Sequence, residues 1–264
     1  MLHPPGQSPF LWRTEPGDGL HVAFTGIDAG NLAFHVSGGG SGEAAAGPPS
    51  GPAAAAAARH RLEDAMGVRR GSTEYLTQVH SARVVPSLGR GWGTETAPRE
   101  ADALVSGTGR DPLAIMVADC LPVVLVSRPA GQQEYAGPTA VAHAGRQGLL
   151  DGVLQSTVAR LRQDGAGDGP GDLHAWIGPG ICGRCYEVPA SMRADGVARI
   201  PATGSTTSWG TPALDLPAGA EAVLTGLGVT VHRSAVCTLE DHRVFSHRRA
   251  PGRGRFVGLV WRTP

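Results

Sequence analysis

The chain has 264 residues, and its 23 basic side chains balance its 23 acidic ones. A formal net charge of zero gives no overall reason to expect nucleic acid or an anionic membrane as a partner. All 23 basic residues are arginines, which excludes a Schiff-base lysine and a P-loop lysine, so anion binding must use guanidinium groups or backbone amides.

The cellular setting can be predicted from the cysteines and from apolar runs. Four cysteines are too few for a disulfide scaffold at this length. The start, MLHPPGQSPF, lacks a charged segment followed by an apolar one, and no apolar run approaches the roughly 20 residues of a membrane span. We therefore expect a cytoplasmic protein without a membrane partner, whose thiols are free to bind metal.

Residues 37–58, SGGGSGEAAAGPPSGPAAAAAA, are low in complexity and predict a loop. Its alanines can continue into a helix that runs through Arg59, Leu62 and Met66, because alanine has the highest helix propensity. There is no internal repeat and no second shift in composition, so residues 1–264 are expected to form a single domain.

From residue 101 onward, short apolar runs are broken by Gly and Pro. They predict strands at 113–118, 123–127, 139–145, 173–178, 229–237 and 255–261, with helices over 149–161 and 218–227. Strands and helices mix without regular βαβ alternation. The pattern therefore indicates an α/β sandwich rather than a doubly wound fold.

Three metal-capable side chains lie at the ends of apolar segments: His80, Cys120 and His143. Two imidazoles and one thiolate suit a borderline-soft ion such as zinc. Three protein ligands leave a fourth position for water or substrate, as in catalytic zinc sites, where water reaches a pKa of roughly 7. The competing interpretation is an inert core thiol with two hydrogen-bonded histidines.

A second cluster competes for a metal. Cys182 and Cys185 form a CxxC pair, and Cys237 and His242 follow 52 residues later. Together they could close a structural zinc site, or the CxxC could be a redox pair, although no thioredoxin-like βαβ unit is visible.

The C-terminal region concentrates cations. Ser246-His247-Arg248-Arg249 lies between apolar segments. Such a charge run is usually a solvated face, but guanidinium groups here could hold phosphate bidentately. Without lysine, this stretch is the best phosphate-binding candidate in the chain.

Several segments share a family pattern in one order: TQVHSARVV (77–85), ADALVSGTG (101–109), MVADCLPVVLV (116–126), AVAHAGRQGLLDGVL (140–154), IGPGICGRCYEV (177–188), CT (237–238) and FSHRR…GR (245–255). The sequence resembles the YfiH-like "laccase-domain" family over roughly residues 75–261. That family was first named as multicopper polyphenol oxidases and is now described as purine nucleoside phosphorylases with adenosine deaminase activity.

The resemblance implies a cytoplasmic α/β/β/α sandwich with mixed sheets and a purine nucleoside near the metal. It implies zinc on His80, Cys120 and His143. It also assigns nucleoside or phosphate contacts to five residues: Arg248, Arg249, Glu187, Asn31 and Arg59. The chain departs from the family at Arg146-Gln147, where Trp-Arg is usual, at Ser81, where glycine is usual, and near Thr25-Gly26, where an arginine is expected. These departures predict that the metal ligands are intact and that some of the residues contacting the substrate are altered.

Four functions follow as hypotheses. The first is a zinc-dependent purine nucleoside enzyme that phosphorolyses adenosine, inosine or guanosine to base and ribose 1-phosphate and deaminates adenosine. The second is copper-dependent oxidation of phenols, disfavoured because ten histidines include no His-x-His, although copper can occupy such a site in vitro. The third is a hydrolase without metal, with Cys120 as nucleophile and His143 as base. The fourth is a degenerate nucleoside-binding protein. Nothing in the sequence predicts the oligomeric state.

Overall fold

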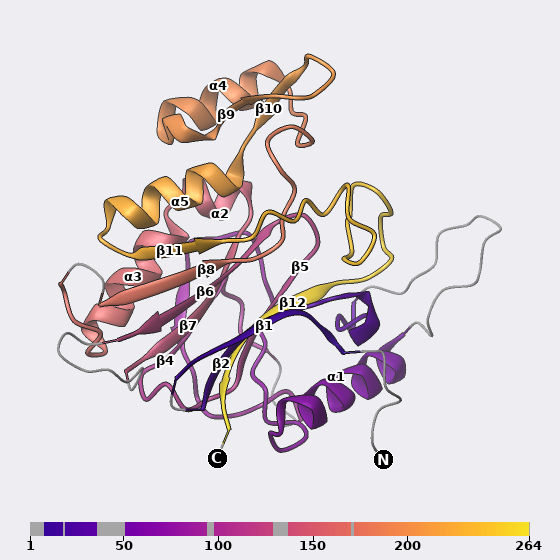
Figure 1. The fold of residues 1–264 in the computed structure, drawn as a ribbon, viewed down its shortest axis with the longest axis vertical. Helices are drawn as coiled ribbons and strands as arrows, with labels where there is room; N and C mark the ends of the chain where they lie inside the picture. Colours follow the sequence, from indigo (N-terminus) through magenta and orange to yellow (C-terminus); the bar gives the residue numbers. More distant parts are fainter. Residues whose placement is uncertain are drawn as a thin grey trace.

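The computed structural model describes residues 8–17, 19–35, 51–93, 98–128, 137–169 and 172–263. Two sheets face each other, and helices lie against both outer faces (Figure 1). The sheets account for most of the strands predicted from the apolar runs. They also contain strands that the sequence patterns did not indicate.

The first sheet has four antiparallel strands in the order β1-β2-β12-β5. The last strand of the chain lies between β2 and β5, so the two ends of the chain build one sheet. The bounds are Phe10–Gly17 (β1), Leu20–Thr25 (β2), Phe256–Arg262 (β12) and Leu113–Val117 (β5).

The second sheet has six strands in the order β11-β8-β6-β7-β4-β3. It is mixed, because β11 with β8 and β3 with β4 run parallel while the other pairs are antiparallel. The bounds are Thr230–Arg233 (β11), Leu173–Ile177 (β8), Leu121–Ser127 (β6), Thr139–Ala144 (β7), Ala103–Ser106 (β4) and Val84–Pro86 (β3).

The core forms three layers of apolar contact. Val22 of β2 and Ile115 of β5 pack against the inner face of the second sheet. Helix α1 (Pro52–Met66) covers the outer face of the first sheet, where Leu62 meets Trp261. Helices α2 (Arg146–Leu150), α3 (Val153–Gln163) and α5 (Leu216–Gly226) cover the second sheet. Because the central strands are buried on both faces, they read as continuous apolar runs rather than as alternating ones. The predicted α/β/β/α sandwich is confirmed.

Three predicted boundaries need correction. Helix α1 begins at Pro52, so the part of the predicted 37–58 loop from 52 onward is helical, and residues 36–50 lie outside the described residues. The predicted helix over 149–161 is divided into α2 and α3 by Gly152, whose φ of 94° is open to glycine and strained for other residues. The predicted strand over 229–237 pairs only as far as Arg233, because its partner β8 ends at Ile177.

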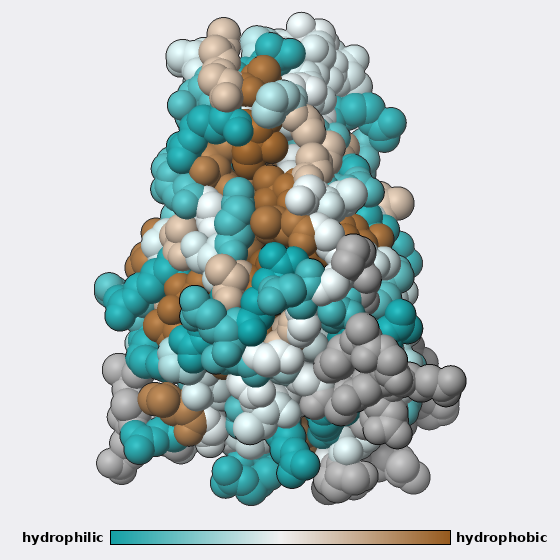
Figure 2. Space-filling model, turned by 90° about the vertical axis from the view of Figure 1, so that its left-hand side faces the viewer, coloured by the Kyte–Doolittle hydropathy of each residue, from teal (hydrophilic) through white to brown (hydrophobic). Residues whose placement is uncertain are grey.

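A smaller unit projects at the top of Figure 1. It consists of helix α4 (Ala190–Arg199), a 3-10 turn (Pro201–Thr203) and the hairpin of β9 (Gly204–Thr206) and β10 (Pro212–Leu214). Another 3-10 turn spans Ile27–Ala29. Figure 2 shows the left-hand side of Figure 1, where hydrophilic residues border a strip of hydrophobic ones. Among the described helices, none has the length and apolarity to cross a bilayer.

Candidate metal centre

The three side chains predicted to bind metal meet at one end of the second sheet. His143 lies on β7, and Cys120 ends the turn that leads into β6. These strands are antiparallel neighbours, with Pro122 opposite His143, so the two side chains come from adjacent strands. His80 arrives from the segment before β3, with its Nε2 3.9 Å from Cys120 Sγ. The three ligand atoms all lie within 4.8 Å of one another.

Asp102 is a candidate site residue that the sequence patterns did not single out. Its buried carboxylate lies 2.8 Å from Nδ1 of His143. It also accepts hydrogen bonds from the backbone amides of His80 (3.0 Å) and Ser81 (2.6 Å). A proton on Nδ1 of His143 leaves Nε2 of that ring with a free lone pair, which is how a carboxylate prepares a histidine to bind metal.

Gly145 forms the floor beneath the three ligands. A Cβ built at this position would lie 2.9 Å from Cδ2 of His80, 3.0 Å from Sγ of Cys120 and 3.4 Å from Nε2 of His143. The ligands therefore occupy the space that a side chain at this position would need. This close convergence around a glycine fits a site built to hold a single ion.

Backbone strain is concentrated at the same site. Among the described residues, only His80 (φ 62°) and Asp119 (φ 83°) have a positive φ without being glycine. Asp119 precedes Cys120, and its carboxylate accepts hydrogen bonds from Thr238 Oγ1 (2.6 Å) and from the backbone amide of Arg248 (2.7 Å). Left-handed backbone is unfavourable for such residues and persists where the surroundings fix it, typically at functional sites.

The electrostatics favour the metal-binding form of the cysteine. Burial alone would raise the pKa of Cys120, but hydrogen bonding with His143 and His80 outweighs it and lowers the pKa to about 6. Burial lowers the pKa of His143, but Asp102 and Cys120 together raise it to about 9. Burial raises the pKa of Asp102, yet bonds from His143 and Ser81 lower it to about 2. These pKa values pair a Cys120 thiolate, the form that binds a metal ion, with a protonated His143 at neutral pH, and a bound metal ion would replace the proton on Nε2 of that ring.

The three ligands open onto a cavity of about 610 Å³. Its wall includes the rings of Phe34 and Tyr75 and the guanidinium groups of Arg59 and Arg255. Arg255 is half-buried, with Nη1 bonded to the carbonyl of Gly254 (2.9 Å). The cavity thus combines a metal-type cluster, flat apolar surfaces and two cations, a combination typical of a small-molecule site.

Arg59 and Asn31, both predicted as substrate residues, lie near each other but differ in role. Arg59 lines the cavity and is only 2% exposed. Its guanidinium lies 3.7 Å from the ring centroid of Tyr75, and its Nε donates to the carbonyl of Leu32 (2.9 Å). Asn31 instead accepts from the backbone amide of Arg255 (3.0 Å) and so positions the chain beside the cavity.

Arg248 and Glu187 form a neighbouring wall rather than part of the cavity lining. Nη1 of Arg248 donates to the carbonyl of Glu187 (2.8 Å), and its guanidinium lies 5.1 Å from the ring centroid of Tyr186. The carboxylate of Glu187 accepts from Nε1 of Trp209 (2.8 Å), so it is engaged with the projecting unit.

Arg249 differs from its predicted role in phosphate binding. Its guanidinium donates to four backbone carbonyls, those of Thr238, Leu239, Asp241 and Val244, at 2.6–3.1 Å. These bonds engage both terminal nitrogens of the guanidinium with the backbone. The structure therefore gives Arg249 a place in the loop scaffold rather than in the cavity.

The departures from the family pattern also have a structural meaning. Ser81, which stands where glycine is usual, donates its hydroxyl to Asp102 at 2.8 Å and so adds a bond to the carboxylate behind the metal ligands. Gln147 is exposed and bonds to Asp151 within the helical turn (2.7 Å). The change from Trp-Arg to Arg146-Gln147 thus leaves the three ligands in place.

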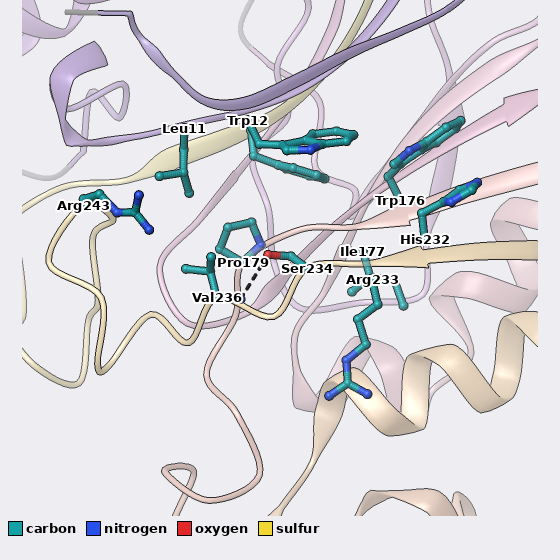
Figure 3. A pocket seen from close by; sticks show the side chains of 11 residues that line it. Leu11, Trp12, Trp176, Ile177, Pro179, His232, Arg233, Ser234, Val236 and Arg243 are labelled. Carbon is teal, nitrogen blue, oxygen red and sulfur yellow. Dashed lines mark hydrogen bonds between the residues drawn. The ribbon is translucent and has the colours of Figure 1, made fainter.

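A second cavity, of about 220 Å³, opens between the edge strands β1 and β11 (Figure 3). Trp12 and Trp176 line it, and the ring of His232 stacks on Trp176 at 4.9 Å between centroids. Arg233 and Arg243 at its rim are each ion-paired with a carboxylate. Neither group of potential metal ligands found among the described residues lies there, so the larger cavity is the candidate site.

If the three side chains bind a metal ion, replacing Asp102 with asparagine is expected to lower the affinity for that ion by about 10–100-fold, because outer partners of ligating histidines have effects of that size. The asparagine side chain has nearly the same shape as aspartate but lacks the negative charge that orients the ring of His143. The measurement is a competition titration against a chromophoric chelator. Asp164→Asn, at an ion pair with Arg160, is the matched control, and an equal loss in both variants would contradict the role of Asp102.

The sequence of this chain is similar to those of known proteins. The family model described as "Multi-copper polyphenol oxidoreductase laccase" matches residues 45–263. A Streptomyces griseus protein named "Purine nucleoside phosphorylase ORF3" is 40% identical over 255 residues, which cover 94% of this chain and 97% of the relative.

Solved structures agree with the observed fold. The Neisseria meningitidis protein NMB0706 is 29% identical with a TM-score of 0.76, over 97% of this chain and 100% of that one. YfiH from Bacillus licheniformis shares the fold, with a TM-score of 0.74 at 24% identity over 92% and 93% of the two chains.

Proposed function

This chain belongs to the family described as "Multi-copper polyphenol oxidoreductase laccase", and we propose that it is a zinc-dependent purine nucleoside enzyme. The family predicted from the motifs is confirmed, and curated relatives at 36–42% identity are named purine nucleoside phosphorylases. The observation that carries the proposal is the convergence of His80, Cys120 and His143 at the mouth of a cavity that also holds two arginines.

Zinc fits the residues that would hold it. Two imidazoles and a thiolate match a borderline-soft ion, and three ligands leave a position open to the cavity. Asp102 fixes the ring of His143 with Nε2 toward the cluster, and Gly145 leaves room for the ligands to converge. When bound, zinc supplies Lewis-acid chemistry that makes water a nucleophile at neutral pH.

For phosphorolysis, the residues of the cavity have to hold an anion beside a nucleoside. Arg59 and Arg255 provide two permanent cations within one cavity, and guanidinium groups bind phosphate through paired hydrogen bonds. The exposed part of the Phe34 ring provides an apolar surface for a base or ribose, whereas the ring of Tyr75 is covered by Arg59. Phosphate attacks C1′ as the bond to the purine breaks, and the leaving base takes up a proton, so positioning is the main contribution of the protein.

For deamination of adenosine, water attacks C6 of the base and ammonia leaves. This reaction needs the amino-bearing edge of the purine near the three ligands, whereas phosphorolysis needs C1′ near the arginines. The cavity is lined both by the three candidate metal ligands and by the two arginines. The proposal therefore includes two orientations of the bound nucleoside, one for each reaction. A cytoplasmic location and the absence of a nucleic-acid partner stay predictions from the sequence.

A second candidate is hydrolysis with Cys120 as nucleophile. The specific observation in its favour is the low pKa of Cys120, about 6, beside His143. Copper-dependent oxidation of phenols is less favoured, because the only group of potential metal ligands with histidine found among the described residues has three members, whereas laccase chemistry needs several coppers.

The decisive experiment measures metal content and turnover of the same purified protein. Adenosine is supplied with and without phosphate, and adenine, inosine and ribose 1-phosphate are quantified. Zinc bound at the site together with phosphate-dependent adenine supports phosphorolysis, and inosine without phosphate supports deamination. Turnover that survives complete removal of metal would contradict the proposal and favour the cysteine hydrolase. Zinc without turnover would favour a nucleoside-binding protein.

Replacing Arg255 with methionine is expected to leave zinc content unchanged and to raise KM for phosphate by about tenfold or more. Losing hydrogen bonds to a charged group costs about 1.5–3 kcal/mol, which corresponds to this range. Arg253→Met is the matched control, because Arg253 is exposed and does not line the cavity. A similar KM in the two variants would exclude Arg255 from phosphate binding.

A further inference from the structure

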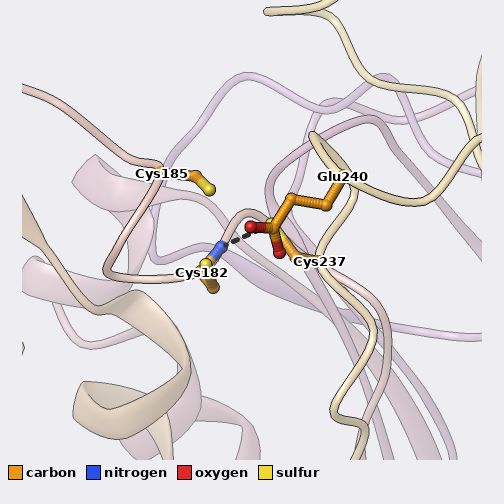
Figure 4. Close-up of side chains that lie close together, drawn as sticks. All are labelled: Cys182, Cys185, Cys237 and Glu240. Carbon is orange, nitrogen blue, oxygen red and sulfur yellow. Dashed lines mark hydrogen bonds between the residues drawn. The ribbon is translucent and has the colours of Figure 1, made fainter. Parts of the chain in front are cut away.

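A second cluster of metal-type ligands lies outside the site described above. Cys182 and Cys185 lie on the loop that follows β8, and Cys237 and Glu240 lie on the loop that follows β11. One ligand atom from each residue, three sulfurs and a carboxylate oxygen, lies within 4.8 Å of the others (Figure 4). All three cysteines are free thiols.

The two loops are brought together by the sheet. Strands β8 and β11 are parallel neighbours, so the loops that follow them leave the same edge. The backbone amide of Thr238 donates to the carbonyl of Gly180 (3.0 Å), and the amide of Cys182 donates to Sγ of Cys237 (3.4 Å). The amide of Cys185 bonds to the carbonyl of Cys182 (2.9 Å) and closes a turn over the CxxC pair.

Apolar packing alone explains the positions of two of the three cysteines. Cys185 and Cys237 are buried beside Ile181, as free thiols in apolar cores often are. Packing does not explain Glu240, an exposed residue whose carboxylate oxygen lies with the three sulfurs. In the absence of a cation, a thiol offers a carboxylate only a weak hydrogen bond. The carboxylate completes a set of four ligands when a cation lies between them.

We propose that Cys182, Cys185, Cys237 and Glu240 bind a structural zinc ion. Thiolates and a carboxylate are zinc ligands, and four protein ligands close the coordination sphere, as in structural rather than catalytic sites. A tetrahedral ion with Zn–S bonds of about 2.3 Å needs sulfurs about 3.8 Å apart, so side-chain movements of about 1 Å close the site. The fourth ligand expected from the sequence spacing was His242, which is exposed and is not in the cluster.

The ion would tie together loops that support the catalytic cavity. Tyr186 and Glu187 directly follow Cys185, and Arg248 contacts both of them. Thr238 directly follows Cys237 and donates to Asp119, the residue before Cys120 (2.6 Å). A structural ion here would fix these contacts without taking part in the reaction. The inference therefore does not depend on the proposed activity.

The test counts zinc in four proteins prepared under reducing conditions: the wild type, Cys120→Ala, Cys185→Ser and the double variant. Elemental analysis is expected to give two, one, one and no zinc ions per chain. In Cys120→Ala, removing the zinc and adding Cd²⁺ should produce a thiolate-to-metal charge-transfer band that saturates at one equivalent. A lower Tm is expected for Cys185→Ser than for Cys120→Ala.

A pair of surface variants identifies the fourth ligand if Cys185→Ser does not fold. In the Cys120→Ala background, Glu240→Gln should weaken Cd²⁺ binding by about tenfold or more, whereas His242→Ala should leave it unchanged. The inference is overturned if Cys120→Ala binds neither zinc nor Cd²⁺, or if rapid alkylation of the native protein finds a disulfide among the three cysteines. Zinc kept in Cys120→Ala but lost in Cys185→Ser would support it even if the catalytic metal proved absent.

Discussion

Replacing Cys120 with alanine is expected to remove zinc from the catalytic site and to reduce nucleoside turnover to the background of the assay. Cys120 supplies the only thiolate among the three ligands and a negative charge that raises the pKa of His143. Two imidazoles alone, one of them exposed, hold zinc poorly because catalytic zinc sites use three protein ligands. The measurement is zinc content together with adenosine turnover at saturating phosphate.

The matched reference for this variant is the wild type, with both proteins stripped of all metal by a chelator so that the cysteine cluster is empty in each. Cys120 is small and half-buried, so the two stripped proteins should unfold at similar temperatures. Loss of turnover then reports on the site rather than on folding. If Cys120→Ala kept full zinc occupancy, as measured with the cysteine cluster separately accounted for, the assignment of the three ligands would be wrong.

A single methyl group at Gly145 is also expected to reduce turnover strongly, although it removes no ligand. A Cβ there would lie 2.9 Å from His80 and 3.0 Å from Cys120, which is closer than real contacts of this kind. The φ of Gly145 is −72°, which alanine adopts without strain, so the conflict is purely one of space. Displacing ligands by up to about 1 Å costs on the order of 100-fold in activity.

The measurement for Gly145→Ala is kcat/KM for adenosine beside zinc affinity. Gly226→Ala in α5 is the control, because a Cβ at that position meets nothing within 4 Å. This control should fold at least as well as the wild type, because alanine favours helix. Normal zinc affinity and turnover in Gly145→Ala would show that the three side chains do not need their observed convergence.

Burial explains only part of which strands could be predicted, because β2 and β4 are buried throughout and were not predicted from their short runs. Strands β5, β7 and β8 lie within one residue of the predicted ranges 113–118, 139–145 and 173–178, because both of their faces are buried and they read as unbroken apolar runs. Edge strand β1 was missed, because its polar residues are solvent-exposed and give no such run. The short pieces β9 and β10 form only because they pair with each other.

The residues of the candidate site also differ in whether the sequence could reveal them. His80, Cys120 and His143 could be singled out because metals prefer their side chains, and the structure brings them together. Asp102 and Gly145 could not, since their roles depend on which atoms lie beside them after folding. The sequence also could not show which arginine has which role. Arg249 donates to backbone carbonyls, whereas Arg255 lines the cavity.

The position of β12 has a consequence for how the protein is made. Residues Phe256–Arg262 are synthesised long after β2 and β5, yet they lie between these two strands and bond to both. During translation these two earlier strands have no partner on their facing edges, and unpaired edges promote aggregation. The first sheet can therefore be completed only after residues 256–262 have been made. A stop codon before residue 256 would remove a central strand together with its hydrogen bonds, and is expected to yield insoluble product rather than a shortened enzyme.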